Sequence, residues 1–65
     1  MREHVYSCMI VSDENNNRPQ MHTYKSTHRA GSKANEKDAI SQWKTKRNGY
    51  GWADVVYGSV YRIDM

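Results

Sequence analysis

This chain of 65 residues has a single cysteine and no long hydrophobic run. With Cys8 alone, no disulfide can form within one chain, and we expect a reducing, cytoplasmic setting. Because the longest apolar run is only a few residues, we expect neither a membrane span nor the hydrophobic segment of a signal peptide. The length predicts one small domain, residues 1–65, whose thin core is compatible with a homodimer.

Phenylalanine is also absent, so five tyrosines and two tryptophans must supply both the core and any aromatic binding surface. The formal net charge of +3 favours a polyanion only weakly. The sequence has no glycine-rich loop of the kind that cradles phosphate groups, and a chain this short has little material for a closed pocket. We therefore expect neither an enzyme nor a bound cofactor.

Two strands are predicted in the first half of the chain. The segment His4–Ser12 is apolar on both of its alternating sets of residues, which is typical of a central strand. A polar loop, Asp13–Pro19, follows it. The next segment, Gln20–Ala30, alternates mostly among polar residues and is predicted to be a half-exposed strand at the edge of the sheet.

The seven-residue loop indicates that these two strands form a hairpin with Ser12 opposite Gln20. In that register, Cys8 lies opposite Tyr24 and His4 lies opposite His28.

A helix is predicted after Gly31 and up to the pair Asn48-Gly49, which suits the end of a helix. Ser32 or Asn35 is the candidate cap, and acidic residues in the first turn and basic residues in the last turn suit the helix dipole. One narrow apolar stripe faces the core, formed by Ala39, Ile40 and Trp43.

The last segment has one alternating set that is almost entirely apolar: Ala53, Val55, Tyr57, Tyr61, Ile63 and Met65. This alternation predicts one long strand with a bulge at Gly58. The alternative is a hairpin split at Gly58-Ser59. The predicted fold is therefore α+β, a small β-β-α-β domain with a three-stranded, mainly antiparallel sheet and one helix packed on one face.

The stretch Asn48-Gly49-Tyr50-Gly51-Trp52-Ala53-Asp54-Val55 resembles the central-strand motif of the RNA-recognition motif family. The resemblance implies that bases stack on Tyr50 and Trp52. In that family, however, a second helix and a further strand follow the motif, whereas here only one strand's worth of chain remains. We therefore do not expect the fold of that family.

Metal binding and catalysis find little support in the residue spacing. His4, Cys8, His22 and His28 all fall on even positions, but His4 and Cys8 are about 13 Å apart along a strand and cannot share one ion. Cys8 lies in the most apolar strand, where a free cysteine is normally an inert core residue. No catalytic or metal-ligating residue is therefore predicted.

We expect instead a non-catalytic protein that modulates or inhibits a macromolecular partner. The first candidate is a protein partner, bound at the exposed sheet face or at an edge strand carrying Tyr24, Lys25, His28 and Arg29. In size alone, the chain is similar to the small proteins with which bacteriophages inhibit host machinery, anti-CRISPR proteins among them. The alternative is a nucleic acid, bound by a patch of cations and aromatic rings: Lys44, Lys46, Arg47, Tyr50 and Trp52.

Overall fold

The computed structural model describes residues 2–13, 16, 18–47 and 51–64 of the chain. One antiparallel sheet packs against one helix, which confirms the predicted α+β class. In chain order the elements are β1 (His4–Ser12), β2 (Gln20–Ser26), α1 (Lys33–Arg47), β3 (Ala53–Val55) and β4 (Tyr61–Arg62).

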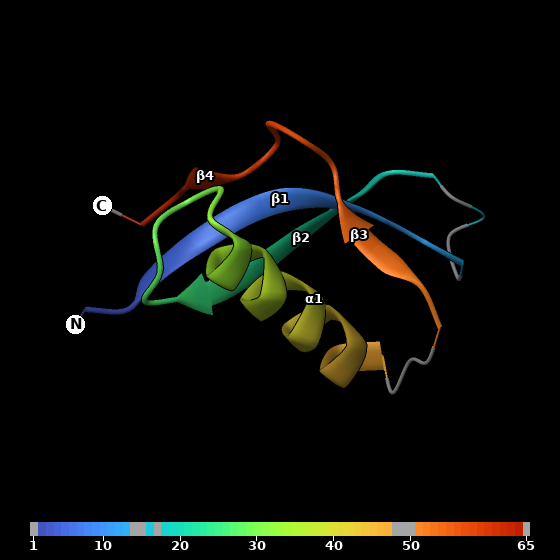
Figure 1. Cartoon of the computed structure of the whole chain (residues 1–65), viewed down its shortest axis with the longest axis horizontal. Coiled ribbons are helices and arrows are strands. Elements are labelled where there is room, and N and C mark those ends of the chain that lie inside the picture. The colour runs from blue at the N-terminus through green and yellow to red at the C-terminus, as the bar shows by residue number, and fades with distance from the viewer. Residues whose placement is uncertain (1, 14–15, 17, 48–50, 65) are drawn as a thin grey trace.

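Strand β1 is the centre of the sheet (Figure 1). Strand β2 pairs with one side of it, and both β3 and β4 pair with the other side, all of them antiparallel to β1. The two short strands therefore follow one another along the same neighbour. The two ends of the chain lie at the same end of the sheet, where the loop between β2 and α1 also passes (Figure 1).

The register of β1 against β2 differs from the predicted one by two residues. Cys8 lies opposite His22 rather than Tyr24, and His4 lies opposite Ser26 rather than His28. A shift of two leaves every side chain on its predicted face. It also sets Tyr6 opposite Tyr24, where the two rings stack with their centroids 5.7 Å apart, a cross-strand aromatic pair that the predicted register lacks.

The last segment is neither an unbroken strand nor a hairpin folded on itself. Val55 lies opposite Ile10 and Tyr61 lies opposite Ser7, so residues 56–60 stand against residues 8–9 of β1. Three extra residues therefore loop out of the strand. The predicted bulge at Gly58 falls within this excursion, and Gly58 has a φ of 77°, a conformation that favours glycine.

Ser59 maintains the hydrogen bonding across this excursion. The Met9 N–H donates to Ser59 Oγ at 3.1 Å, so the hydroxyl replaces the strand carbonyl that has moved away. The same hydroxyl donates to the Val56 carbonyl at 2.6 Å and ties the excursion to its own base. One side chain thus satisfies a donor of the central strand.

An excursion of three residues also reverses which side of the sheet the side chains face. Val55 shares the helix-covered face with Ile10, whereas Tyr61 shares the opposite face with Ser7. Val55 is accordingly buried and Tyr61 is 58% exposed. The predicted continuous apolar face of the last segment is therefore wrong, because it is divided between the two sides of the sheet.

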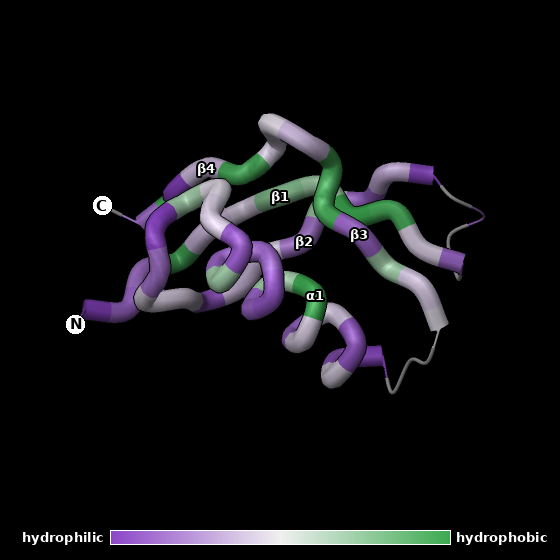
Figure 2. The backbone as a smooth tube through the Cα atoms, viewed as in Figure 1, coloured by the Kyte–Doolittle hydropathy of each residue, from purple (hydrophilic) through white to green (hydrophobic). Residues whose placement is uncertain are grey.

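Helix α1 covers one face of the sheet and begins as predicted (Figures 1 and 2). Ser32, the first of the two candidate caps, accepts the Asn35 N–H through its hydroxyl at 3.2 Å. Ala39 and Trp43 are buried and Ile40 packs beside them, which confirms the predicted stripe. The predicted helix end at Asn48-Gly49 lies outside the described residues.

The core between the helix and the sheet is largely aromatic. Rings contact one another in a row from His4 through Tyr6, Tyr24 and His22 to Trp43. Apart from these rings, the core holds Cys8, Ile10, Ala39 and Val55. Across the described part of the chain, no helix has the length and apolar content needed to cross a membrane.

Candidate functional site

The outer edge of β2 is closed by side chains of α1. The Lys25 N–H donates to Gln42 Oε1 at 3.0 Å, and Gln42 Nε2 donates to the Lys25 carbonyl at 2.6 Å. The Gln42 amide thus offers one acceptor and one donor, as the backbone of a neighbouring strand would. Lys46 Nζ adds a bond to the Thr23 carbonyl at 3.4 Å. A strand that joined this edge would have to displace both side chains.

The four predicted edge residues do not share one edge. Tyr24 is buried at 3% exposure, and its hydroxyl donates to Asn35 Oδ1. The strand predicted to reach Ala30 ends at Ser26, so His28 and Arg29 belong to the loop that follows. Ser26 explains this early end, because its hydroxyl accepts the His28 N–H and donates to Asp38 on the helix.

The predicted basic and aromatic patch lies where α1 ends, and we call it the helix-end corner: Lys44, Lys46, Arg47 and Trp52. Lys46 binds the β2 carbonyl described above, and the Arg47 guanidinium lies 3.5 Å from the centroid of the buried Trp43 ring. Trp52 is 52% exposed. The remaining member of the predicted patch, Tyr50, lies outside the described residues.

Gly51 lies in close contact with Asp13, directly before Trp52 of the helix-end corner. Its φ is 98°, and a Cβ atom there would lie 2.6 Å from Asp13 Oδ2, the oxygen that accepts the Trp52 N–H. A side chain at this position would displace that carboxylate. Gly51, the second glycine of the stretch that resembles the RNA-recognition motif, therefore has a structural role in this fold.

Cys8 and His22 lie opposite each other under the helix, where burial favours the neutral form of both side chains. Burial raises the pKa of the Cys8 thiol to about 11. Burial likewise lowers the pKa of His22, whose Nε2 donates to the Ala39 carbonyl at 3.0 Å. Within residues 2–13, 16, 18–47 and 51–64, no three histidine, cysteine or acidic side chains are grouped to hold a metal ion.

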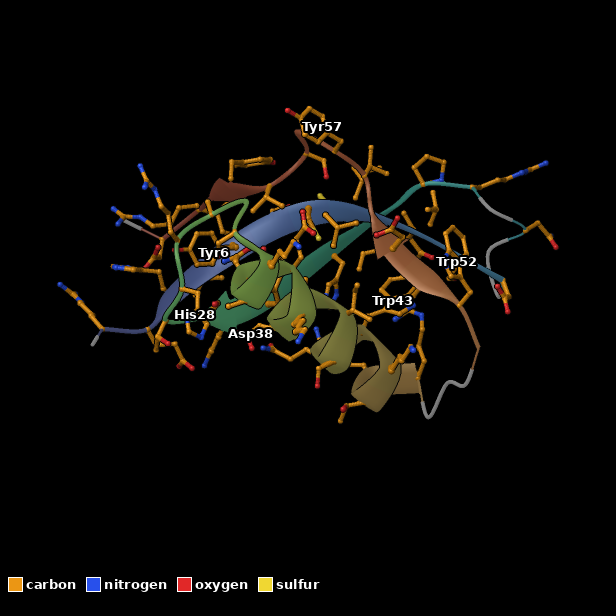
Figure 3. The ribbon with its side chains drawn as sticks, viewed as in Figure 1. Tyr6, His28, Asp38, Trp43, Trp52 and Tyr57 are labelled. Carbon is orange, nitrogen blue, oxygen red and sulfur yellow. The ribbon has the colours of Figure 1, made fainter. Side chains whose placement is uncertain are left out.

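A cluster of arginine and histidine side chains lies at the opposite end of the molecule from the corner, and only His28 and Arg29 of it were among the predicted site residues. Three arginines and two histidines line a shallow concave surface with a volume of about 500 Å³. We call this surface the arginine end: Arg2, His4, His28, Arg29 and Arg62. Tyr6 and His28 mark this end of the molecule, and Trp43 and Trp52 mark the other (Figure 3).

The loop that carries His28 and Arg29 is fixed by buried polar groups. The His28 carbonyl accepts two hydrogen bonds, from the Tyr6 hydroxyl and from Asn35 Nδ2, each at 3.1 Å. Asn35 is fully buried, and burial raises the pKa of Tyr24, which keeps the phenol protonated as the donor to Asn35. The backbone that presents His28 and Arg29 is therefore held by the core.

A carboxylate joins the two ends of the chain beside this surface. Asp64 Oδ2 lies 3.2 Å from His4 Nδ1, and Asp64 Oδ1 lies 3.3 Å from Arg62 Nε. Desolvation would raise the pKa of Asp64, but the hydrogen bond and charge of His4, the Val5 N–H and the Arg62 charge together lower it. The β4 end is thereby attached to the start of β1.

The sheet face that α1 leaves uncovered carries most of the exposed apolar side chains. On β2, Met21 is 65% exposed, and in the last segment Tyr61 and Ile63 are 58% and 43% exposed. Half-buried residues of β1 lie between them by the alternation of the strand. We call this surface the open face: Val5, Met9, Val11, Met21, Tyr61 and Ile63.

Comparisons of this chain with protein-family models, curated proteins and solved structures found no match. Arg2, Arg29 and Arg62 stand far apart in the sequence, and Arg62 reaches the arginine end because the last segment pairs with β1, the first strand of the chain. That pairing depends on the path of the last segment, which the sequence left open.

Proposed function

We propose that this protein is a non-catalytic binding protein that modulates a protein partner, and that it docks on that partner through the open face. The observation that carries the proposal is the exposure of Met21, Tyr61 and Ile63 on the one sheet face without a covering layer. Methionine and tyrosine are enriched at protein interfaces, where they supply contact area.

The edges of the sheet favour the face over strand addition as the binding mode. Gln42 and Lys46 occupy the backbone groups of β2. At the other edge, Asp54 Oδ1 accepts the Val55 N–H at 2.9 Å. Of the residues predicted at the β2 edge, the exposed Lys25, His28 and Arg29 can offer side chains to a partner, whereas Tyr24 is buried.

Charge favours a different protein over a second copy of this chain. Each copy carries a formal net charge of +3, and Lys25 stands exposed beside the open face on β2. Two copies would bring like charges together, whereas a partner with an acidic rim would gain attraction. The thin core remains compatible with a homodimer, and the experiment below measures that state directly.

The test is a pull-down with the tagged full chain from a nuclease-treated lysate, followed by reconstitution with the purified partner and calorimetry. We expect a complex of defined stoichiometry. Because Met21 and Tyr61 supply central contact area, Met21→Thr/Tyr61→Thr should weaken it by about tenfold or more. Tyr57→Thr is the matched control, since Tyr57 is 99% exposed and lies on the excursion (Figure 3), where it lines a hollow together with Ala30 and Glu36 rather than with open-face residues.

Three results would count against this proposal. Unchanged affinity of Met21→Thr/Tyr61→Thr would exclude the open face. Tighter binding by Gln42→Ala would show that the partner adds a strand to the freed edge of β2. If light scattering showed a dimer of the wild type and a monomer of Met21→Thr/Tyr61→Thr, the open face would bind a second copy of the chain.

A further inference from the structure

We propose that the arginine end binds the backbone phosphates of a nucleic acid strand. This inference does not depend on a protein partner, because it uses none of the side chains of the open face. It also differs from the sequence-based alternative, which placed nucleic-acid contacts at the helix-end corner.

The arginine end concentrates positive charge. The concave surface is lined by Arg2, Arg29 and Arg62, and none of the described residues that line it is acidic. Among the three arginines only Arg62 is partly neutralised, by Asp64, which also pairs with His4. Arg2 and Arg29 are exposed and make no hydrogen bond or ion pair through their side chains with the described part of the protein. Two full positive charges are therefore available to an anion.

The fold holds the backbones of Arg29 and Arg62 in place. Arg29 follows the residue whose carbonyl is fixed by Tyr6 and Asn35, and the Ser32 N–H and hydroxyl both donate to the Arg29 carbonyl, at 3.1 and 2.8 Å. Arg62 lies on β4, paired opposite Tyr6. The backbone positions of these two cations are fixed before any ligand arrives, which reduces the entropy lost on binding.

The chemistry of these side chains suits a phosphate backbone. A guanidinium presents donors in a planar fork that matches the oxygens of a phosphate group. The surface is shallow and open, which suits a backbone lying across it rather than an enclosed small molecule. Tyr6, the one tyrosine that lines it, is 5% exposed and its hydroxyl is bonded to His28, so no phenol ring is free for base stacking. We therefore expect binding that is independent of sequence.

An acidic peptide is the competing ligand, because carboxylates fit the same fork. Peptides are normally anchored by a side chain in an apolar socket as well as by charge. The lining of the arginine end is cationic or polar apart from the buried Tyr6 ring and the small Ala30 side chain, so it offers no such socket. A flexible, uniformly charged strand is the better match.

The experiment is fluorescence anisotropy of a labelled short single-stranded DNA of mixed sequence, titrated with the full chain at a series of salt concentrations. We expect binding at low salt that weakens as salt is added. Replacing the three arginines, as Arg2→Gln/Arg29→Gln/Arg62→Gln, should weaken binding by about tenfold or more and reduce the slope of log K against log salt by about 2.

Two further variants separate a site from a general effect of charge. Arg18→Gln/Lys33→Gln/Lys37→Gln also removes three positive charges, but from exposed positions outside every surface named above. This variant should retain most of the affinity and of the salt slope. The single variant Arg29→Gln replaces an exposed side chain without a described partner. We therefore expect this variant to keep the fold, so that any weaker binding reports the lost charge. Circular dichroism of each variant confirms that the fold is kept.

Four outcomes would overturn the inference. No binding at low salt would exclude a nucleic acid ligand. Equal losses in the two triple variants would reduce the effect to net charge. A larger loss in Lys44→Gln/Lys46→Gln/Arg47→Gln would move the site to the helix-end corner. Equal competition by polyglutamate at matched charge concentration would reassign the surface to acidic proteins.

Discussion

The arginine end and the helix-end corner are both basic, but they are assembled in different ways. The cations of the corner come from one turn of α1, whereas the arginine end draws on the start of β1, the loop before α1 and β4. At the corner, Lys46 binds a β2 carbonyl and Arg47 stacks on Trp43. At the arginine end, Arg2 and Arg29 face solvent without a partner in the described structure.

This difference shows that charges adjacent in a sequence are not automatically charges available to a ligand. Cations in the last turn of a helix already interact favourably with the helix dipole, and their long stems cover apolar surface. Cations brought together from distant segments have no such local use. They stay together only because the fold holds their backbones. The buried hydrogen bonds beneath the arginine end, which we call the frame, are therefore the first place to test this difference between the two ends.

The largest effect is expected from Asn35→Ala, which removes the centre of the frame under the arginine end. The Tyr24 hydroxyl loses its acceptor and the His28 carbonyl loses one of two donors, both in or near the core. Leaving buried polar groups unpaired should lower the free energy of unfolding by about 2 to 4 kcal/mol. Urea unfolding monitored by tryptophan fluorescence measures the change.

Tyr24→Phe provides the second arm of a double-mutant cycle with Asn35→Ala, since it removes the same hydrogen bond from its other side. The two changes together should cost clearly less than the sum of the single changes. A cost of Asn35→Ala below about 0.5 kcal/mol, within the range of an ordinary surface substitution, would mean that the loop does not depend on this frame.

Much of the fold could be predicted element by element, because local sequence signals agree with the strands and the helix that form. The alternation of His4–Ser12 marked the central strand, and Ser32 with the stripe of Ala39, Ile40 and Trp43 marked the helix. These features depend on residues close together in the sequence. The register of β2 was missed because it is decided by the stacking of Tyr6 on Tyr24, a contact between distant residues.

The last segment could not be predicted for a similar reason. The alternation of its apolar residues is regular, and only the three-residue excursion places Val55 and Tyr61 on opposite faces. That excursion is tolerated because the Ser59 hydroxyl serves the Met9 N–H, a hydrogen bond that no local pattern reveals. The excursion places Arg62 opposite Tyr6, and the arginine end includes Arg62 for that reason.

A smaller effect, dependent on pH, should separate the two ends. Burial lowers the pKa of His22 below its ordinary value of 6.5, and the charges of Lys46 and Arg47 at the corner lower it further against the opposing bond to Ala39. The unfolded chain then takes up a proton at a higher pH than the folded one. The contribution of His22 to stability is therefore complete above 6.5 and is lost as the pH falls below it.

His22→Phe should remove this dependence, because it keeps an aromatic ring at the position, and the Ala39 carbonyl retains its helical partner. The free energy of unfolding, measured above and below pH 6.5, should change less in the variant than in the wild type. The Asp64 carboxylate at the other end also has a lowered pKa, so its contribution is lost only in the acid range below 3.8. An Asp64→Asn variant that flattened the curve near pH 6 would contradict this separation.

The smallest effect is expected at the corner itself, from Arg47→Gln. The guanidinium stacks on the face of the Trp43 ring, so its removal should cost about 0.5 to 1 kcal/mol of unfolding free energy. In the anisotropy assay, Arg47→Gln should weaken DNA binding less than Arg29→Gln does, although each change removes one positive charge. The reason is that Arg47 already occupies the face of Trp43, and binding a phosphate would require it to share or leave that position. If Arg47→Gln reduced the affinity as much as Arg29→Gln, a cation engaged with its own protein would serve a ligand as well as an unengaged one, and the distinction between the two ends would fail.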